Sequence, residues 1–488
     1  MNRRQLIKTG GILIPSVLLG LHSCTATNKS TLDADVLIVG AGLSGLNAAL
    51  LLEEYGFKVK VIEGTDRLGG RVHTVKDSIV PGHPELGANG IGGGYARVLN
   101  AAKKYNVEIG PSRPRTEPRK GEILYAIKNQ FISNSDWPNH QLNPYPQEYK
   151  KGSPTSPPWS IYAEMNPLPK NDLTAWKKPE FAKWDKSVYD LMKEKGFSDE
   201  AINMGVSTNS SYGVDAKEIS ALMYFQIMNF ILHQSSSFAE QGGAAIGGNQ
   251  RIPEAMGAAF KQDILLKSPV KAIKSEKDSA SVVLESGKIL KAQYVICTLP
   301  NSALRKISLS PASQGAQQKA IQELSYTPCV QIHYALKKKY WEEDGLAPSM
   351  WTDQLSGRFM ALKNNLNAPD EVTSCLAYLN SKVAIQIDKM GEAEGTKVVT
   401  ESLFKMRPSL RDAIEPIYYW TWSDSNRFAG GAYAFWKPGQ ITAFSNKIAE
   451  PNGRVHFAGE HTADLNRGME GAMESGERAA FDLMNLLG

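Results

Sequence analysis

The sequence predicts an α/β fold assembled from discontinuous segments, because segments near both ends have the pattern of a strand, a glycine-containing turn and a helix. Near the start, residues 36–39 are apolar and mostly β-branched, three glycines follow, and residues 46–55 have the composition of a helix. Near the end, residues 455–458 predict a strand and residues 468–488 a helix rich in good helix formers. The long interval between these segments predicts a second, α+β domain.

The first turn, Gly40-Ala41-Gly42-Leu43-Ser44-Gly45, has the glycine spacing of a dinucleotide-binding turn. Gly40 allows the tight bend, Gly42 lets backbone N–H groups approach a pyrophosphate, and Gly45 lets the helix pack closely on the strand. The helix N-terminus then faces the phosphates with its partial positive charge. The turn therefore predicts a Rossmann-like domain.

The segment after the first helix favours FAD over NAD. A second apolar strand, residues 59–62, ends at Glu63, whose carboxylate would accept hydrogen bonds from the ribose hydroxyls. The turn Arg67-Leu68-Gly69-Gly70-Arg71 then places two arginines around paired glycines, which suits a second clamp on the pyrophosphate.

With these motifs the sequence resembles the flavin-containing amine oxidase family, which includes monoamine, polyamine and L-amino acid oxidases. The family carries the same glycine turn, acidic residue and Leu-Gly-Gly-Arg turn. Further matching segments are Glu85-Leu86-Gly87-Ala88, Gly247-Gly248-Asn249-Gln250-Arg251-Ile252-Pro253, Thr298-Leu299-Pro300 and Gly453-Arg454-Val455-His456-Phe457-Ala458-Gly459-Glu460. The resemblance covers nearly everything after about residue 35.

The resemblance implies the FAD contacts. Glu460 would bind the ribityl chain, and the helix that opens at Gly468-Met469 would point its N-terminus at the flavin N1 and C2 carbonyl. The residues expected to bind the cofactor are Gly40, Gly42, Leu43, Ser44, Gly45, Glu63, Gly64, Arg67, Gly70, Arg71, Val270, Glu460 and Met469. Ala432 stands where monoamine oxidases have the cysteine that bonds to the flavin, so the FAD is expected to be non-covalent.

The chemistry implied by the family is hydride removal from the carbon that bears a neutral amine to flavin N5. Water hydrolyses the resulting imine, and O2 reoxidises the flavin to give H2O2. Lys306 falls on the family lysine that holds a water next to N5, and a solvated surface lysine is its alternative. Tyr433, in Gly430-Gly431-Ala432-Tyr433, would form one wall of an aromatic substrate cage, with core packing as the alternative.

Two departures from the family concern the substrate. The second cage aromatic is replaced by Gly468, which would leave that side of the pocket open, and Asn89-Gly90 replace the arginine that binds the substrate carboxylate in snake-type L-amino acid oxidases. Arg467 could point into the open side and bind a carboxylate, or it could pair with Asp464 or a backbone carbonyl.

On Arg467 and the open cage, the sequence slightly favours an L-amino acid as the substrate over a primary or secondary amine. Two other classes of enzyme stay open. One is a dehydrogenase that passes electrons to a quinone or partner protein, and the other is a flavin-dependent desaturase. A non-catalytic FAD-binding module has little support, because both halves of the cofactor site look intact.

Composition excludes few other classes. The chain has 488 residues, of which 42% are hydrophobic and 22% charged, which leaves room for two domains. A net charge of +5 without a basic stripe makes nucleic acid an unexpected partner. Apart from Cys24, the cysteines Cys297, Cys329 and Cys375 are widely spaced, so buried thiols are expected rather than disulfides or a metal site.

Residues 1–24 have the pattern of a signal peptide of the twin-arginine kind. Arg3-Arg4 precede an apolar run at residues 10–21 that is too short to span a bilayer. Leu21-His22-Ser23-Cys24 resembles a lipoprotein cleavage box, so Cys24 could become a lipidated N-terminus with a tether at residues 25–34. This predicts export by the twin-arginine route to the periplasm, with or without a membrane anchor, or secretion from the cell.

The motifs divide the rest of the chain into two predicted domains. Residues 35–111, 241–301 and 452–488 are assigned to the FAD-binding domain. Residues 112–240 and 302–451 are assigned to the substrate domain, in which residues 329–336 and 374–378 predict strands and residues 395–404 an amphipathic helix. Oligomeric state is not predicted.

Overall fold

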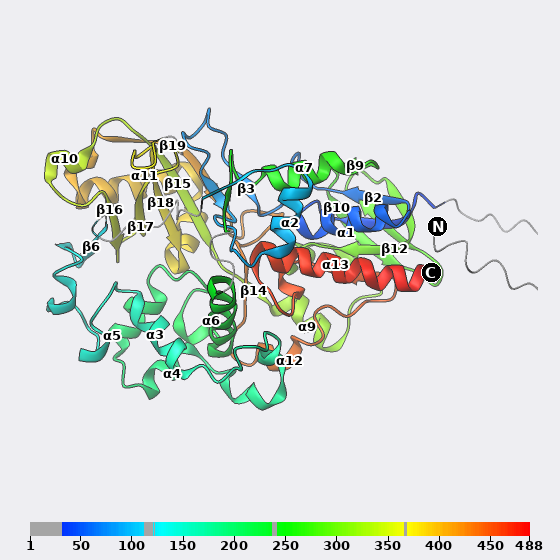
Figure 1. Ribbon diagram of the computed structural model, residues 1–488, viewed down its shortest axis with the longest axis horizontal. Coiled ribbons are helices and arrows are strands. Elements are labelled where there is room, and N and C mark those ends of the chain that lie inside the picture. Colours follow the sequence, from blue (N-terminus) through cyan, green and yellow to red (C-terminus); the bar gives the residue numbers. More distant parts are fainter. Residues whose placement is uncertain (1–31, 112–120, 122, 237–241, 366–367) are drawn as a thin grey trace, which may run out of the picture. The chain divides into compact units, whose positions relative to one another are not determined.

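The computed structural model describes residues 32–111, 121, 123–236, 242–365 and 368–488 (Figure 1). The predicted signal peptide with Cys24, and most of the tether, lie outside these residues. Within the described ranges, no helix combines the length and the apolar character needed to cross a bilayer.

An eight-stranded sheet in the described part of the chain brings the two ends of the chain together. Its order is β13 (Ser308–Ser310), β10 (Val270–Ser275), β11 (Ala280–Leu284), β12 (Ile289–Cys297), β1 (Ala34–Val39), β2 (Val59–Ile62) and β9 (Ile264–Leu265), with β21 (Val455–Phe457) also paired to β12. Strands β2, β1, β12 and β21 run parallel, whereas β10, β11 and β12 form an antiparallel meander. The mixed α/β class predicted from the sequence is confirmed.

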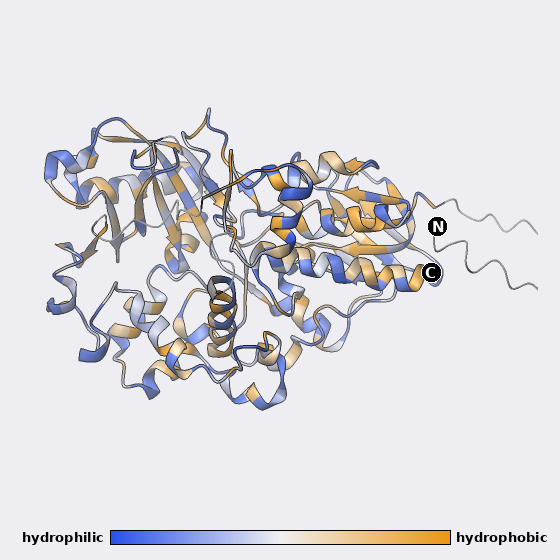
Figure 2. Ribbon diagram, viewed as in Figure 1, coloured by the Kyte–Doolittle hydropathy of each residue, from blue (hydrophilic) through white to orange (hydrophobic). Residues whose placement is uncertain are grey.

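Strand β1, in the middle of this sheet, is buried on both faces. Val36 and Ile38 pack into one core together with residues of the helices, and Leu37 and Val39 pack into another with residues of the meander. This alternation is the two-residue period of a strand, and it makes β1 a continuous apolar run. In Figure 2 the strands of this sheet are predominantly orange, in keeping with that burial.

Four helices supply the core on the first face: α1 (Leu43–Glu54), α2 (Ala96–Lys104), α7 (Arg251–Ala259) and α13 (Gly468–Leu487). Figure 1 shows α13, in red at the C-terminal end, alongside α1, in blue. The two helices approach closely at Gly476, where an added Cβ would lie 2.2 Å from the Ser44 carbonyl oxygen. The first and last helices of the described chain therefore form one layer.

A seven-stranded sheet in the described residues forms the second core region. Its order is β19 (Ile414–Thr421), β15 (Cys329–Leu336), β18 (Ser374–Asn380), β17 (Arg358–Leu362), β16 (Ser349–Thr352), β6 (Ile123–Ile127) and β7 (Gln130–Ile132). All neighbours are antiparallel except β16 and β6. Helix α11 (Ser381–Met406), which has a kink at Gly391, packs on one face of this sheet, and α10 (Tyr340–Asp344) shares the same core.

Further helices and small ribbons complete the structure. The helices are α3 (Ser156–Met165), α4 (Val188–Glu194), α5 (Asp199–Ile202), α6 (Ala221–Ser236), α8 (Asn301–Leu304), α9 (Gly315–Glu323) and α12 (Gln440–Phe444). The ribbons pair β3 (His73–Thr74) with β4 (Glu85–Gly87), β5 (Ile109–Pro111) with β8 (Gly243–Ala245), and β14 (Ser325–Tyr326) with β20 (Ala434–Phe435). Residues from α3, α4, α6, α9 and α12 share a third core.

The sheets refine the predicted domain boundaries. Strands β1, β2, β9–β12 and β21 come from the three segments assigned to FAD binding, and the seven-stranded sheet comes from the two segments assigned to the substrate domain. One strand departs from this division, since β13 joins the eight-stranded sheet although it follows residue 301. A boundary near residue 310 therefore fits the sheets better than one at 301.

Candidate active site

A cavity of about 940 Å³ is lined by residues from both sheets and from both ends of the chain. Its size is within the usual range of ligand sites. The predicted residues in its lining are Gly40, Gly42, Leu43, Ser44, Glu63, Gly64, Arg67, Gly70, Arg71, Val270, Lys306, Tyr433, Glu460 and Met469. Gly45 and Arg467 do not line it.

The glycine turn has the local geometry predicted for it. Gly40 has φ +107°, and a Cβ on Gly45 would lie 2.0 Å from the Gly40 carbonyl oxygen, which is why the helix can pack closely on the strand only with glycine at 45. Gly42 is the N-cap of α1, and a Cβ there would meet only the Gly69 carbonyl oxygen, at 3.8 Å. The open space next to Gly42 is the cavity, so this turn leaves room for a phosphate group at the helix N-terminus.

Glu63 is buried at the end of β2 and is held by the turn. Its Oε2 accepts from the Ala41 N–H at 2.9 Å, and its Oε1 accepts from the Thr65 N–H and hydroxyl at 2.8 and 2.9 Å. A carboxylate oxygen has more than one acceptor position. The carboxylate is therefore fixed in the cavity wall and retains acceptor capacity for a ribose.

The two arginines of the second turn have different partners. Arg67 donates to the carbonyl oxygens of Gly70 at 2.6 Å and Val72 at 3.2 Å, and so braces the turn itself; desolvation lowers the pKa of this guanidinium. Arg71 donates to Glu460 Oε1 at 2.9 Å and to the Ala432 carbonyl oxygen at 3.2 Å. Both line the cavity, but much of their hydrogen-bonding capacity is used within the protein.

The ion pair of Arg71 and Glu460 joins the first and last parts of the chain. Glu460 Oε1 also accepts from the Ala434 N–H at 2.9 Å. Burial alone would raise the pKa of Glu460, but Arg71, His461 and the Ala434 N–H outweigh it and lower the pKa. Glu460 is therefore a buried, ionised carboxylate in the cavity wall.

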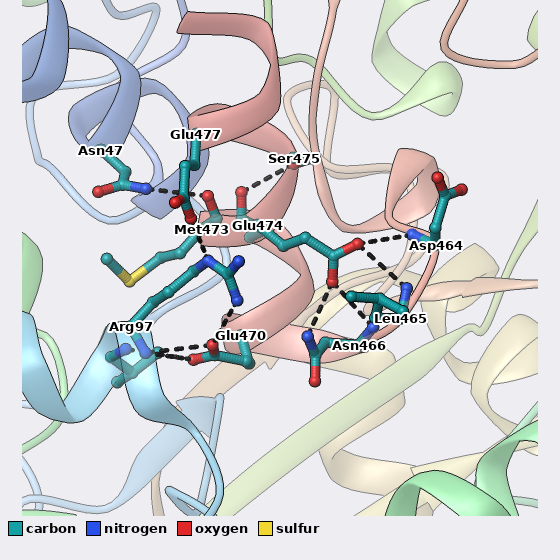
Figure 3. Close-up of polar contacts among 12 residues, drawn as sticks. Asn47, Arg97, Asp464, Leu465, Asn466, Glu470, Met473, Glu474, Ser475 and Glu477 are labelled. Carbon is teal, nitrogen blue, oxygen red and sulfur yellow. Dashed lines mark hydrogen bonds and ion pairs between the residues drawn. The ribbon is translucent and has the colours of Figure 1, made fainter. Parts of the chain in front are cut away.

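Two acidic residues of α13 fix the N-terminus of that helix (Figure 3). Glu470 accepts from the backbone N–H groups of Arg97 and Val98, at the start of α2, and from the Arg97 guanidinium at 3.1 Å. Glu474 accepts from three consecutive backbone N–H groups, at residues 464–466, at 2.8–3.0 Å. These bonds hold the loop that leads to Gly468 and Met469 and aim the helix N-terminus at the cavity.

Tyr433 lines the cavity, as predicted, and its hydroxyl donates to the Ser211 carbonyl oxygen. Its ring centroid lies 4.9 Å from that of Tyr212. Tyr378, on β18, and Tyr95 are further tyrosines in the lining. Tyr95 comes near the position of the absent cage aromatic, because its hydroxyl is 3.7 Å from where a Cβ on Gly468 would be. That side of the pocket is thus less open than expected.

Lys306 follows the short helix α8 and lies in an exposed part of the lining. Tyr433, in contrast, is half-buried. The position of Lys306 in the cavity wall is compatible with the predicted role next to the flavin, and its exposure is equally compatible with a solvated lysine. The role stays a prediction.

Arg467 does not have the place expected for a carboxylate partner. Its guanidinium donates to Gln226 Oε1 at 3.2 Å and to the Ala434 carbonyl oxygen at 3.3 Å, and lies 5.7 Å from the Tyr212 ring centroid. It lines a separate cavity of about 10 Å³ rather than the large one. The alternative, a bond to a backbone carbonyl, describes its contacts better, and the carbonyl is that of Ala434. Asp464 forms an ion pair with Lys177 and not with Arg467.

The remaining cysteines are free and buried, as the sequence indicated. Trp422, whose indole donates to the Leu86 carbonyl oxygen at 2.7 Å, lines the large cavity, whereas Trp436 borders the small one. Sequence reasoning missed Tyr212, Arg358 and Trp420, and it treated Tyr378 only as part of a strand. The sequence pattern that could have indicated such residues is the two-residue period of a strand. It predicts which side chains share a face but not which strands lie next to each other.

The model of the flavin-containing amine oxidoreductase family matches residues 43–484. The chain belongs to this family. FAD is its cofactor, and the glycine turn, Glu63 and Glu460 provide a cradle that fits the dinucleotide.

Individual relatives agree with this assignment. The enzyme is 25% identical over 481 residues to flavin-containing amine oxidase A of Sus scrofa, with 93% of this chain and 85% of the relative covered. It is 23% identical over 466 residues to amine oxidase B of Homo sapiens, with 93% and 86% covered.

Among solved structures, wild-type putrescine oxidase bound to putrescine has a TM-score of 0.70 at 22% identity, and cyclohexylamine oxidase from Brevibacterium oxydans IH-35A has 0.71 at 20%. Each comparison covers 93% of this chain and 99% of the other. These likenesses show the fold. The relatives are amine oxidases, and none of the comparisons supports the preference for L-amino acids that was based on Arg467.

Proposed function

We propose that the enzyme oxidises a small amine at its C–N bond with O2 as the electron acceptor. The observation that carries the proposal is the single cavity in which the dinucleotide cradle, the N-terminus of α13 and a group of tyrosines meet. Bound FAD would accept the hydride and pass the electrons to O2, which is reduced to H2O2.

The tyrosines of the cavity position the amine. The rings of Tyr433 and Tyr212 are close enough to form one aromatic wall, and aromatic faces attract and orient amines. Burial raises the pKa of Tyr433 well above its ordinary value, so the phenol stays protonated and bonded to Ser211. Tyr433 thus acts as a wall and not as a base, and the amine must be neutral when its hydride leaves.

The experiment is an anaerobic one, followed by admission of air. Primary and secondary amines are mixed with the FAD-loaded protein without O2, and the bleaching of flavin absorbance is followed. Air is then admitted and H2O2 is measured. Bleaching followed by peroxide supports the proposal; bleaching without reoxidation by O2 indicates a dehydrogenase, and no bleaching by any amine rejects amine oxidation.

Tyr433→Ala and Tyr433→Phe separate the wall from its hydroxyl. We expect Tyr433→Ala to lower kcat/KM for amines by roughly fivefold, because an aromatic contact contributes about 1 kcal/mol. Tyr433→Phe keeps the ring and should retain most of the activity. Tyr55→Ala, which removes a 60% exposed tyrosine, is the control. Equal kcat/KM values for wild type and Tyr433→Ala would show that the Tyr433 ring does not position the amine.

Lys306 enters the proposal as the residue that promotes reoxidation by O2. Lys306→Met should leave reduction by the amine unchanged and slow reoxidation, whereas Lys319→Met, at an exposed position on α9, should change neither. An unchanged rate of reoxidation in Lys306→Met would mean that Lys306 is a solvated lysine without a role in the reaction with O2.

The proposal includes export by the twin-arginine route and a possible lipid anchor at Cys24. Arg3-Arg4 and the apolar run at residues 10–21 support export, because this route carries folded proteins and the enzyme must bind FAD before it crosses. Cys24→Ala is compared with wild type by fractionation. Loss of the variant from the membrane fraction supports the anchor, and identical partition rejects it.

A further inference from the structure

The substrate side of the cavity contains one arginine that the proposed mechanism does not use. Arg358 is the first residue of β17, and it lines the cavity. Of the described residues of the seven-stranded sheet in that lining, Arg358 alone carries a charge. The others are Cys329, Met360, Tyr378 and Trp420.

The strand register places Arg358 in the same row of side chains as Tyr378, which also lines the cavity. Arg358 pairs with Tyr378 on β18, and Tyr378 pairs in turn with Gln331 on β15. Residues directly opposite each other in antiparallel strands share a face of the sheet. The Arg358 guanidinium carbon lies 4.6 Å from the Tyr378 ring centroid, so the arginine stacks on one of the tyrosines of the cavity.

The guanidinium is held in place but not neutralised. Its Nη2 donates to Asn380 Oδ1 at 2.7 Å, whereas its Nε and the Asn380 Nδ2 are buried without a hydrogen-bond partner. No carboxylate of a described residue forms an ion pair with Arg358, in contrast to Arg71, which pairs with Glu460, and Arg427, which pairs with Glu285. Because a half-buried cation without a counter-charge is costly, this site favours an anion.

We propose that Arg358 selects amines that also carry a carboxylate. This inference rests on the proposed amine oxidation, since it names the substrate class for the same cavity. A guanidinium presents a planar pair of donors that matches a carboxylate. Because Arg358 belongs to the seven-stranded sheet, a carboxylate bound to it would not occupy the dinucleotide cradle. The same positive charge repels a second ammonium group, so diamines should be poor substrates although a structural neighbour is a putrescine oxidase.

The test uses substrates matched in their carbon chain. L-leucine is compared with 3-methylbutylamine, and 6-aminohexanoate with hexylamine and 1,6-diaminohexane. The rate of anaerobic flavin reduction is measured over a range of concentrations for wild type, Arg358→Met, Arg358→Lys and Arg411→Met. Arg411 is an exposed arginine that packs on Phe404, outside the cavity lining, and it provides the control.

For wild type we expect at least one carboxylate-bearing compound to react faster than the monoamine of the same carbon chain, and the diamine to react slowest. Arg358→Met should lower the reduction rate at low concentration of that carboxylate by roughly 10- to 100-fold, because a hydrogen bond to a charged group is lost. It should leave the reduction rates with the monoamines nearly unchanged and raise the rate with the diamine. Arg358→Lys keeps the positive charge but loses the planar pair of donors, so its reduction rate with the carboxylate-bearing compound should lie between those of wild type and Arg358→Met.

A binding measurement makes the test independent of turnover. Benzoate and benzamide are titrated into the oxidised holoenzyme while the flavin spectrum is followed. Benzoate should perturb the spectrum of wild type and Arg411→Met but bind at least about tenfold more weakly to Arg358→Met, whereas benzamide should not distinguish the variants. Thermal melts and flavin content show whether each variant is folded. If Arg358→Met does not fold, Arg358→Lys takes its place in both measurements.

If wild type prefers the monoamine or the diamine, and Arg358→Met leaves the ratios of the rates unchanged, the selection by Arg358 is overturned while amine oxidation stands. If neither an amine nor an amino acid reduces the flavin, amine oxidation itself fails, and this inference fails with it.

Discussion

The two sides of the cavity differ in how their charged groups are satisfied. On the cofactor side, Arg71 pairs with Glu460, Arg67 bonds to the carbonyls of its own turn, and Glu63 accepts from the backbone. On the side of the seven-stranded sheet, the cation of Arg358 has no such counter-charge among the described residues. The cofactor side is thus organised before any ligand binds, whereas the substrate side leaves a charge for the ligand to satisfy.

The largest expected effect comes from breaking the pair that joins the ends of the chain. Glu460→Ala leaves Arg71 without its partner, and the side chains of these residues are only 9% and 21% exposed. We expect a loss of about 3 kcal/mol in the free energy of unfolding, measured by denaturant titration, and a loss of bound FAD.

Glu285→Ala is the matched control, because its pair with Arg427 is 46% and 54% exposed and should cost less than about 1 kcal/mol. Equal losses in the two variants would mean that the Arg71–Glu460 pair has no special role in joining the chain ends.

Two glycine variants distinguish packing from cofactor contact within the same turn. Gly45→Ala places a Cβ 2.0 Å from the Gly40 carbonyl oxygen, so the apoprotein should lose about 2 kcal/mol of unfolding free energy. Gly42→Ala meets no protein atom closer than 3.8 Å, so its apoprotein should be nearly as stable as wild type. Its affinity for FAD should still fall by about tenfold, since the Cβ enters the cavity.

The measurements are denaturant titration without FAD and a titration of the apoprotein with FAD. Normal FAD affinity in Gly42→Ala would contradict the placement of the phosphates at this turn.

The most gradual expected effect is a loss of stability in acid, to which one histidine on each side of the cavity contributes. Burial lowers the pKa of His333, on β15, to about 3 and that of His461, next to Glu460, to about 4. An unfolded histidine titrates near 6.5, so below that pH the unfolded chain binds more protons than the folded one. The contribution of these two histidines to stability should therefore be constant above pH 6.5 and fall by about 1.4 kcal/mol per pH unit for each of them as the pH drops toward 4.

Melting temperatures from pH 7.5 to 4.5 measure this slope. His333→Asn and His461→Asn should each reduce it, and a slope that neither variant changes would assign the acid sensitivity to other groups.

The same contrast explains what could be predicted from the sequence. The cofactor residues are contiguous motifs whose geometry is local, so Gly40, Gly42, Glu63 and Arg71 could be placed from residue type and spacing. The pairing of Arg71 with Glu460 could not, because the two residues lie at opposite ends of the chain.

On the substrate side, positions depend on register. Tyr378 and Arg358 face the cavity because β18 and β17 pair as they do, and no local pattern shows that pairing. The choice between the two alternatives for Arg467 could not be made for a similar reason, since its partners Gln226 and Ala434 come from elements far away in the chain. A side chain at a helix N-cap can point in several directions, and only its neighbours decide which.

The central claim is that the two ends of the chain form one non-covalent FAD site. The most direct measurement is the flavin content of the purified protein, before and after precipitation with acid. We expect a yellow protein with one FAD for each chain, all of it released into the supernatant, because Ala432 offers no thiol for a bond to the flavin. A colourless protein that takes up no added FAD, or a flavin that stays with the precipitate, would contradict it.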